Sequence, residues 1–292
     1  MSLIPVYRHR ATPLHAARAG VGLSLCGAFL LVAVLFSNPI VLAGALVGLA
    51  AAATGAGAWE QLRRAARLAV PLALLLVAIN ALVYREGETV IFRGGDVLGR
   101  RLDVTLEAVA AGGAAALRVL VVAAVFALYS AALDPDEVLR LLRRFSYHSA
   151  LTGSLATRLI PVLHRDAQRM VEAARCRPDP PRRSRVVLAT LGRSLDRAID
   201  VAAALEVRGY ARARPAAPMR RSWSRHDVRI AAVAALVAAV AVGARVGGLG
   251  GFEAYPTLSV AAGPADLTLA AALALAGALP AAGTRARLGV AS

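Results

Sequence analysis

Residues 19–58 read AGVGLSLCGAFLLVAVLF, SNP and IVLAGALVGLAAAATGAGA, two apolar runs separated only by Ser37-Asn38-Pro39. No charged residue occurs anywhere in this stretch. A helix needs about 20 mainly apolar residues to cross the hydrocarbon core of a bilayer. Because Pro39 disfavours helix at the residue before it, the helical run should break there. The stretch therefore predicts two membrane spans, about 19–36 and 40–58, joined by a tight turn.

Four further apolar segments extend this pattern along the 292 residues. They predict spans at about 66–83, 105–129, 228–246 and 258–282, and Pro264 is a second possible start for the last helix. Hydrophobic residues make up 58% of the chain and charged residues only 18%, against about a quarter charged in soluble domains. The predicted fold class is an all-α polytopic integral membrane protein with about six transmembrane helices. No short apolar stretch ends in a small-residue cleavage site, so a cleaved signal peptide is not expected.

The charge is strongly basic and consists of a single residue type. There are 34 basic against 18 acidic residues, a net of +16, and every basic residue is Arg. The absence of Lys excludes a P-loop lysine or a Schiff-base lysine on this chain. The two cysteines, Cys26 and Cys176, predict neither a disulfide framework nor a metal site. The five His residues are scattered without an HExxH pattern, so no metal ligand and no catalytic residue is assigned.

The positions of the arginines predict how the chain lies in the membrane. Segment 131–227 carries 19 Arg against 10 acidic residues, a net of +9, and segment 60–67 carries three Arg. Further arginines lie in the two terminal tails, at Arg8, Arg10, Arg18, Arg285 and Arg287. Since Arg-rich loops stay in the cytoplasm, both termini and segment 131–227 are expected on the cytoplasmic side of the cell membrane. Segment 84–103 has balanced charges and Gly94-Gly95, which suggest a short outer loop or a hairpin. Topology explains most of the positive charge, so membrane lipid is an expected partner and nucleic acid is not.

The predicted organisation has three parts: an N-terminal transmembrane region 1–130, a cytoplasmic helical region 131–227 and a C-terminal transmembrane region 228–292. The middle part opens with Asp134-Pro135-Asp136-Glu137, which combines a helix cap, Pro at the first position and acids in the first turn. This pattern predicts a helix that continues to about Phe145.

Two longer amphipathic helices are expected after it, at about 154–175 and 184–208. Apolar residues form a stripe on each helix. On the first the stripe is Leu159, Val162, Leu163, Met170 and Ala174, and on the second it is Leu188, Leu191, Leu195, Ile199, Ala202 and Leu205. Pro161 marks a kink or a start within the first helix, and Gly209 can supply a left-handed stop after the second. The stripes could be covered by each other, by the membrane surface or by a partner protein.

Each long helix ends in a triplet with a central arginine, Ala174-Arg175-Cys176 and Val207-Arg208-Gly209. Further pieces are Asp134-Pro135-Asp136-Glu137, Ala156-Thr157-Arg158-Leu159-Ile160-Pro161, Glu172-Ala173 before the first triplet, and Asp196-Arg197-Ala198-Ile199-Asp200 and Ala204-Leu205-Glu206 before the second, which Tyr210 follows. In this order they resemble the transmembrane T component of energy-coupling factor (ECF) transporters, the EcfT/CbiQ family that includes the cobalt-transport permease CbiQ. With the flanking spans, the resemblance covers most of the chain.

The resemblance implies a function in ATP-driven uptake of a vitamin or a transition-metal micronutrient. In that family two cytoplasmic coupling helices end in an X-Arg-X signature, often Ala-Arg-Gly, and bind two ABC-type ATPase subunits, A and A′. The signatures map onto residues 174–176 and 207–209, where Cys176 stands for the usual Gly or Ser and Val207 for Ala. A separate S component binds the substrate. ATP and magnesium would then be bound by the ATPases, and no cofactor by this chain, which would be a non-catalytic subunit.

The same residues also fit other roles. Arg175 and Arg208 could each complement a helix dipole, although their pairing favours coupling. Arg158, Glu172 and Glu206 are possible supporting contacts. Arg165, Arg169, Arg193 and Arg197 fit solvated faces or headgroup contacts better than ATPase contacts. The alternative functions are the permease subunit of a conventional ABC importer and, less favoured, a membrane-embedded lipid-modifying enzyme.

Two polar residues and two glycine pairs fall inside the predicted spans. Arg118 needs a partner on another span or has to snorkel to the interface, because an intramembrane charge is costly. Asn80 is expected to form a hydrogen bond between helices. The pairs Gly44/Gly48 and Gly243/Gly247 predict close helix packing, with docking of an S component as the alternative.

Overall fold

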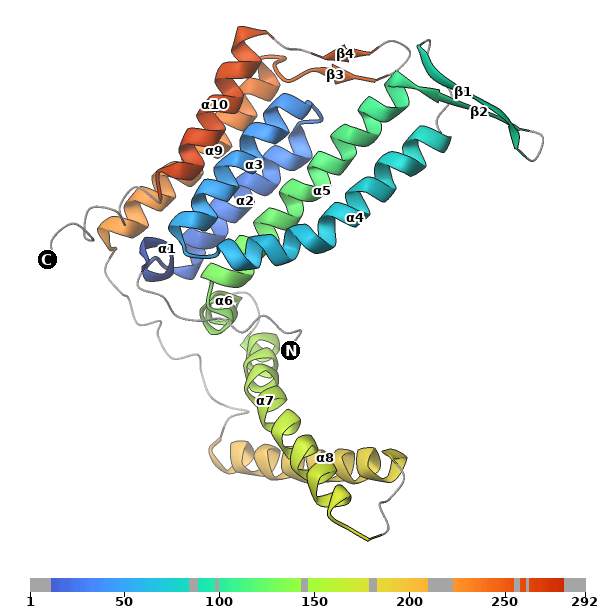
Figure 1. Ribbon diagram of the computed structural model, residues 1–292. Coiled ribbons are helices and arrows are strands. Elements are labelled where there is room, and N and C mark those ends of the chain that lie inside the picture. Colours follow the sequence, from blue (N-terminus) through green and yellow to red (C-terminus); the bar gives the residue numbers. More distant parts are fainter. Residues whose placement is uncertain are drawn as a thin grey trace, which may run out of the picture. The chain divides into compact units, whose positions relative to one another are not determined.

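The computed structural model (Figure 1) describes most of the chain as two compact units. One unit, residues 1–134 with 222–292, is called the bundle unit here, and the other, residues 135–221, the insert unit. The described residues are 12–83, 89–97, 100–142, 147–178, 183–209, 223–254, 258–260 and 263–280. Predictions for Arg8, Arg10, Phe145, Tyr210, Arg285, Arg287 and the end of the sixth span at residues 281–282 lie outside them.

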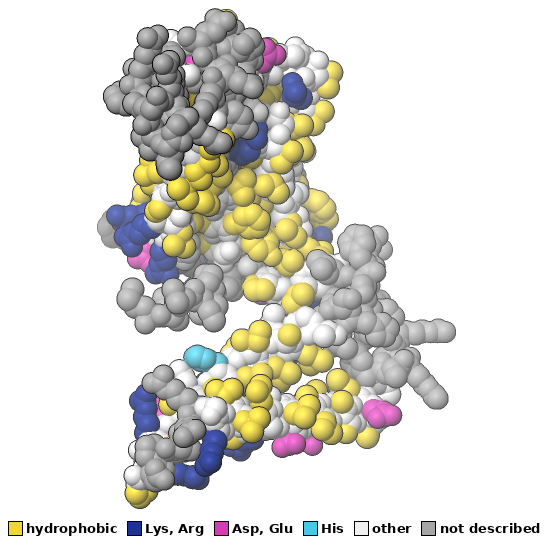
Figure 2. Space-filling model, turned by 90° about the vertical axis from the view of Figure 1, so that its right-hand side faces the viewer, with side chains coloured by type: hydrophobic (Ala, Val, Ile, Leu, Met, Phe, Trp, Pro, Cys, Tyr) yellow, Lys and Arg dark blue, Asp and Glu magenta, His cyan; other side chains and the backbone are white. Residues whose placement is uncertain are grey.

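The bundle unit is built from apolar helices packed side by side (Figure 1). Its helices are α1 (Pro13–Ala16), α2 (Ala19–Leu35), α3 (Pro39–Gly55), α4 (Trp59–Val83), α5 (Leu106–Ala132), α9 (Arg225–Val246) and α10 (Pro264–Ala278). The helices α4, α5 and α9 are long and apolar enough to cross a membrane, at 22 to 27 residues, while α2, α3 and α10 are shorter apolar helices. Hydrophobic side chains cover much of the visible face of this unit (Figure 2). The predicted all-α membrane fold is confirmed.

One helix starts earlier than hydropathy predicts. α4 begins at Trp59 and includes the exposed residues Glu60, Arg63 and Arg64 before its apolar part. Glu, Arg, Ala and Leu are good helix formers, so the charged turns extend the span as one helix. Figure 1 shows α4 bending along its length, and Pro71 inside the helix accounts for the bend.

Two loops of the bundle unit form short antiparallel hairpins. Segment 84–103, whose structure the sequence left open, contributes β1 (Val90–Val97) and β2 (Arg100–Thr105). Buried Glu107 accepts hydrogen bonds from the Thr89 backbone at 3.1 Å and the Thr89 hydroxyl at 2.7 Å, which fastens the hairpin to the start of α5. A second hairpin, β3 (Phe252–Glu253) and β4 (Ser259–Val260), precedes α10, which therefore starts at Pro264.

Glycines allow α3 and α10 to touch backbone to backbone. A methyl group on Gly44 would lie 2.5 Å from the Ala270 carbonyl oxygen, and one on Gly277 would overlap the backbone of Gly48. The close packing expected of Gly44 and Gly48 is thus confirmed. Since α10 covers both residues, they are not free to dock another protein. Gly243 is exposed and has no such neighbour among the described residues, so the second pair makes no comparable contact there.

Arg118 lies in the middle of α5 but bonds to the turn between α2 and α3. Its Nη2 atom donates to the Phe36 carbonyl oxygen at 3.0 Å and to Ser37 Oγ at 2.7 Å. Helical side chains point toward the N-terminus of their helix, which brings the guanidinium to that turn. The partner required for this charge is therefore the α2–α3 turn.

Asn80 bonds differently from the expectation. Its side-chain nitrogen donates to the Leu76 carbonyl oxygen at 2.8 Å, one turn earlier on its own helix. A methyl group on Gly112 of α5 would lie 3.1 Å from the Asn80 Cβ atom. Asn80 thus packs against α5 through its carbon atoms, because the short side chain is satisfied locally, and the described residues show no hydrogen bond from it to another helix.

The opposite end of the bundle is tied together by the segment around α1. The Nε2 atom of buried His15 donates to the Ala131 carbonyl oxygen of α5 at 3.1 Å. The Arg18 backbone nitrogen donates to the buried Asp227 carboxylate of α9 at 2.7 Å, and the Arg18 guanidinium lies 3.8 Å from it. Residues 12–18 therefore link the end of α5 to the start of α9.

Replacing Gly277 with Ala should destabilise the bundle unit, because the new methyl group has to displace the backbone of α3. We expect a loss of about 1–3 kcal/mol, measured as a lower midpoint temperature of the detergent-solubilised chain. Gly243→Ala is the matched control, since a methyl group there meets nothing within 4 Å. Equal stability of the two variants would contradict the α3–α10 contact.

Arg118→Met keeps the length of the side chain but removes both hydrogen bonds to the α2–α3 turn. Losing them should cost about 1–3 kcal/mol in the same thermal measurement. Ser37→Ala removes only the hydroxyl acceptor and should cost less, about 0.5–1.5 kcal/mol. A higher midpoint temperature for Arg118→Met would mean that burying the Arg118 charge destabilises the fold by more than its two hydrogen bonds stabilise it.

Candidate functional site

The insert unit contains the three helices predicted after the fourth span. They are α6 (Pro135–Leu142), α7 (Tyr147–Arg175) and α8 (Arg183–Val207). α6 starts at the proline that the sequence marked, and α8 lies within one residue of its predicted bounds. α7 begins at Tyr147 and not near Ser154, and Pro161 stays inside the helix without ending it. Gly209 has φ +69°, so it supplies the left-handed stop expected after α8.

α6 packs against the first half of α7. A methyl group on Gly153 would lie 3.0 Å from a Leu139 methyl carbon, so the glycine makes room for this leucine. The Arg158 guanidinium lies 4.0 Å from the Asp136 carboxylate, a long and mostly exposed ion pair. Arg158, a possible supporting contact for a partner, is thus already engaged with α6, although an exposed pair of this kind contributes little energy.

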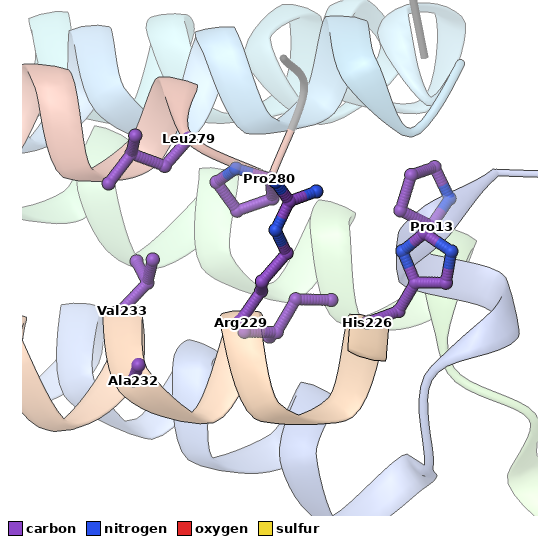
Figure 3. A pocket seen from close by; sticks show the side chains of 8 residues that line it. Pro13, His226, Arg229, Ala232, Val233, Leu279 and Pro280 are labelled. Carbon is purple, nitrogen blue, oxygen red and sulfur yellow. The ribbon is translucent and has the colours of Figure 1, made fainter. Parts of the chain in front are cut away.

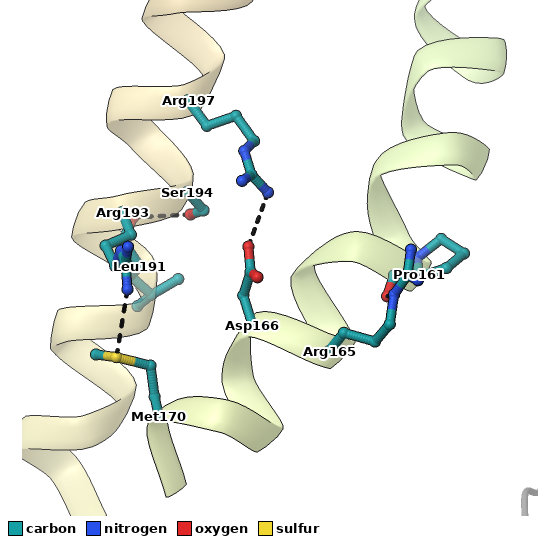
Figure 4. Close-up of polar contacts among 8 residues, drawn as sticks. All are labelled: Pro161, Arg165, Asp166, Met170, Leu191, Arg193, Ser194 and Arg197. Carbon is teal, nitrogen blue, oxygen red and sulfur yellow. Dashed lines mark hydrogen bonds and ion pairs between the residues drawn. The ribbon is translucent and has the colours of Figure 1, made fainter. Parts of the chain in front are cut away.

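α7 and α8 cross each other and touch near the middle of each helix (Figures 1 and 4). Arg197 of α8 donates to the Asp166 carboxylate of α7 at 2.7 Å. One turn away, the Arg193 guanidinium lies 3.8 Å from the Met170 sulfur atom. From the sequence, both arginines fit solvated faces or headgroup contacts, and Asp166 carries no signal of its own. The missing signal is the crossing itself, which brings together residues 31 positions apart.

The apolar stripe of α8 faces away from α7. Leu188, Leu191, Leu195 and Ile199 are 72%, 59%, 63% and 60% exposed. The half-buried residues of α8 lie on the other side of the helix, at Val186, Thr190, Ser194, Val201 and Leu205. At 100° per residue these two sets point in nearly opposite directions, except that Leu205, counted in the stripe, lies at its edge. α7 therefore does not cover most of the apolar stripe of α8.

The stripe of α7 is covered to a greater extent. Its members are all half-buried: Leu159, Val162, Leu163, Met170 and Ala174. Hydrophobic side chains remain visible on the surface of the insert unit in Figure 2. The two helices thus differ, because among the described residues of this unit α7 packs on both α6 and α8 whereas α8 packs mainly on α7.

The two arginine triplets lie at the free ends of the crossing helices. Figure 1 shows the C-terminal ends of α7 and α8 leaving the crossing in different directions. Arg175 and Arg208 are exposed, and neither guanidinium bonds a described residue. Around them Ala174 is half-buried, Cys176 and Gly209 are exposed, and Val207 is 89% exposed. The arrangement presents two unpaired cations, each beside small or apolar residues.

The supporting acids act through their backbones in this structure. The Glu172 carbonyl oxygen accepts from the Cys176 nitrogen at 3.2 Å, and the Glu206 carbonyl oxygen accepts from the Gly209 nitrogen at 2.8 Å. These bonds close the last turn of each helix, while both carboxylates stay exposed. Each triplet is therefore shaped by its helix end, and both acidic side chains are available to a partner.

Comparison with known proteins gives one family. Residues 10–219 match the family model of the CbiQ cobalt transport proteins, a stretch of 210 positions in a chain of 292. The match runs from the start of the bundle unit through both arginine triplets. A search of curated proteins found no match. Because the match covers well over half of the sequence, the chain belongs to the CbiQ family of cobalt transport proteins.

Proposed function

We propose that this chain is the energy-coupling transmembrane subunit of an ECF-type, ATP-driven importer of a vitamin or a transition-metal micronutrient. In this role α7 and α8 bind two ABC-type ATPase subunits, A and A′, through Arg175 and Arg208. A separate S component carries the substrate. The observation that carries the proposal is the apolar stripe of α8, which is exposed and faces away from α7, on a helix that ends just before Arg208, a residue unpaired among the described residues.

The stripe needs a cover that the described part of the insert unit does not supply. Burying one Val, Leu or Ile side chain contributes about 1.5–3 kcal/mol, so four such residues form a strong binding surface. The second half of α8 also exposes Asp196, Asp200 and Glu206. These carboxylates would be repelled by the anionic cytoplasmic leaflet. A protein surface therefore suits this half of the helix better than the membrane surface does.

Arginine suits the triplets because its planar guanidinium donates five hydrogen bonds in a fixed geometry. Placed at a helix end, it can enter a groove on the ATPase and bond to carboxylates or carbonyl oxygens there. Since α7 and α8 are joined at mid-length by the Arg197–Asp166 ion pair, a movement of either end would change the angle between them. We propose that closure of the ATPase pair on ATP acts in this way and that the spans pass the change to the S component.

The division of labour follows from the composition. Without lysine, this chain has no conventional P-loop, so the ATPases would bind ATP and magnesium and this chain would bind no cofactor and catalyse no reaction. The arginine distribution supports a cell-membrane protein whose termini and insert unit are cytoplasmic. Vitamins, their precursors, cobalt and nickel all remain candidate substrates, because the S component would select among them.

Two alternatives fit the observations less well. The permease of a conventional ABC importer contacts its ATPase through a single short loop helix, whereas α7 and α8 are 29 and 25 residues long. A lipid-modifying enzyme would need clustered acids or histidines, and the described residues contain no group of three or more that could hold a metal ion.

The first test removes both coupling arginines. Arg175→Ala with Arg208→Ala should abolish co-purification of co-expressed ATPase subunits from detergent, because both charged contacts are lost. Arg169→Ala with Arg185→Ala is the control, since it removes two exposed arginines from the same two helices without touching the triplets. Equal recovery of the ATPases with both double variants would refute the coupling role of the triplets.

The second test addresses the stripe. Leu191→Glu with Leu195→Glu places two charges on exposed positions, so the chain should still insert and elute as the wild type does. Recovery of the ATPases should fall at least tenfold, because the surface proposed to bind them is no longer apolar. Ala189→Glu, on the exposed side of α8 that carries Asp196, should leave recovery unchanged. Normal recovery with the leucine double variant would mean that the stripe is covered by something other than the ATPases.

A further inference from the structure

A cavity of about 300 Å³ lies at the end of the bundle unit where α9 begins and α10 ends. Figure 3 shows Arg229 and His226 extending from α9 toward Pro280 and Pro13, respectively. Ile230, Val233 and Leu279 supply apolar wall. The volume falls at the lower end of the range found for ligand pockets, about 300–1,000 Å³.

The mouth of this cavity carries one arginine and one imidazole that are unpaired among the described residues. Neither Arg229 nor His226 makes a hydrogen bond or an ion pair to any residue that the structure describes. The described residues that line the cavity include no carboxylate. The nearest acid in the sequence, Asp227, is fully buried and already accepts hydrogen bonds from Arg18 and Ser224. An anion entering the cavity would therefore meet Arg229 with no acidic competitor in its lining.

The wall changes from polar to apolar along α9. From His226 to Val233 the helix rises about 10 Å, and after Arg229 the lining residues of α9 carry only apolar side chains. A ligand that fits this gradient has a negative head and a hydrocarbon continuation. A free inorganic anion would use the mouth and leave the wall empty.

Most arginines of the bundle helices also lie at this end of the bundle unit. The helices alternate in direction, so the start of α4 with Arg63, Arg64 and Arg67 lies at the same end as the start of α9. Arginine-rich ends face the cytoplasmic leaflet, which holds the anionic lipids.

We propose that the cavity between α1, α9 and α10 binds the phosphate headgroup of an anionic glycerophospholipid, with its acyl chain against Val233 and Leu279. Arg229 donates hydrogen bonds to the phosphate, and His226 closes the other side of the mouth. The site is separate from the arginine triplets and does not depend on the proposed coupling role.

Native mass spectrometry of the full chain, released from detergent with added lipid, tests this assignment. Phosphatidylglycerol should bind in a saturable manner and phosphatidylcholine much more weakly. Arg229→Gln should weaken phosphatidylglycerol binding about fivefold or more, the effect expected of one cation at an anionic headgroup. Arg245→Gln removes an exposed arginine charge at the other end of α9 and should leave phosphatidylglycerol binding unchanged.

A second variant tests the apolar wall of the cavity at an exposed position, so the buried core of the bundle unit is unchanged. Ala232 is exposed and lines the cavity, so Ala232→Phe should fill it and also weaken phosphatidylglycerol binding. The site is refuted if the two lipids bind equally, if Arg229→Gln matches Arg245→Gln, or if Ala232→Phe binds as the wild type does. Displacement of the lipid by millimolar inorganic phosphate would also overturn the proposal, because it would show a site for a soluble anion.

Discussion

Polar groups inside a bilayer cannot bond to water, so each must find its partner within the protein. This constraint organises the bundle unit. Asn38 caps α3 by accepting from the Ile40 nitrogen at 2.9 Å, and its amide nitrogen donates to the Gly251 carbonyl oxygen at 3.3 Å. Asp266 accepts from the Gly250 nitrogen at 2.7 Å. The loop before α10 is thereby held to the starts of α3 and α10.

Much of the helix pattern could be predicted from the sequence, since apolar runs and helix signals are local. Pro39, Pro135 and Gly209 mark helix boundaries that the structure reproduces within about one residue. The starts of α4 and α7 were missed, because hydropathy records where apolar residues begin and not where helical hydrogen bonding begins. The local bond of Asn80 and the pairing of Arg197 with Asp166 depend on which atoms come close in three dimensions, which no spacing rule gives.

In the insert unit, the sequence identifies the apolar stripes of α7 and α8, and the structure shows which of the two stripes is exposed. Periodicity finds the stripes of α7 and α8 but treats them as equivalent. The structure distinguishes the two stripes, because among the described residues of this unit α7 packs on both α6 and α8 whereas α8 packs mainly on α7. Membership in the CbiQ family gives these helices a setting in membrane transport. The free triplets and the exposed face of α8 then indicate which surfaces a partner protein could use.

The short segment 12–18 has a mechanical consequence. It bonds through His15 to Ala131, one residue before the end of α5, and through Arg18 to Asp227, three residues into α9. The chain leaves the bundle for the insert after α5 and returns at α9, so these seven residues brace the exit against the entrance. The two points at which the chain leaves and re-enters the bundle unit are therefore fixed to each other, and a displacement of either point would have to move both.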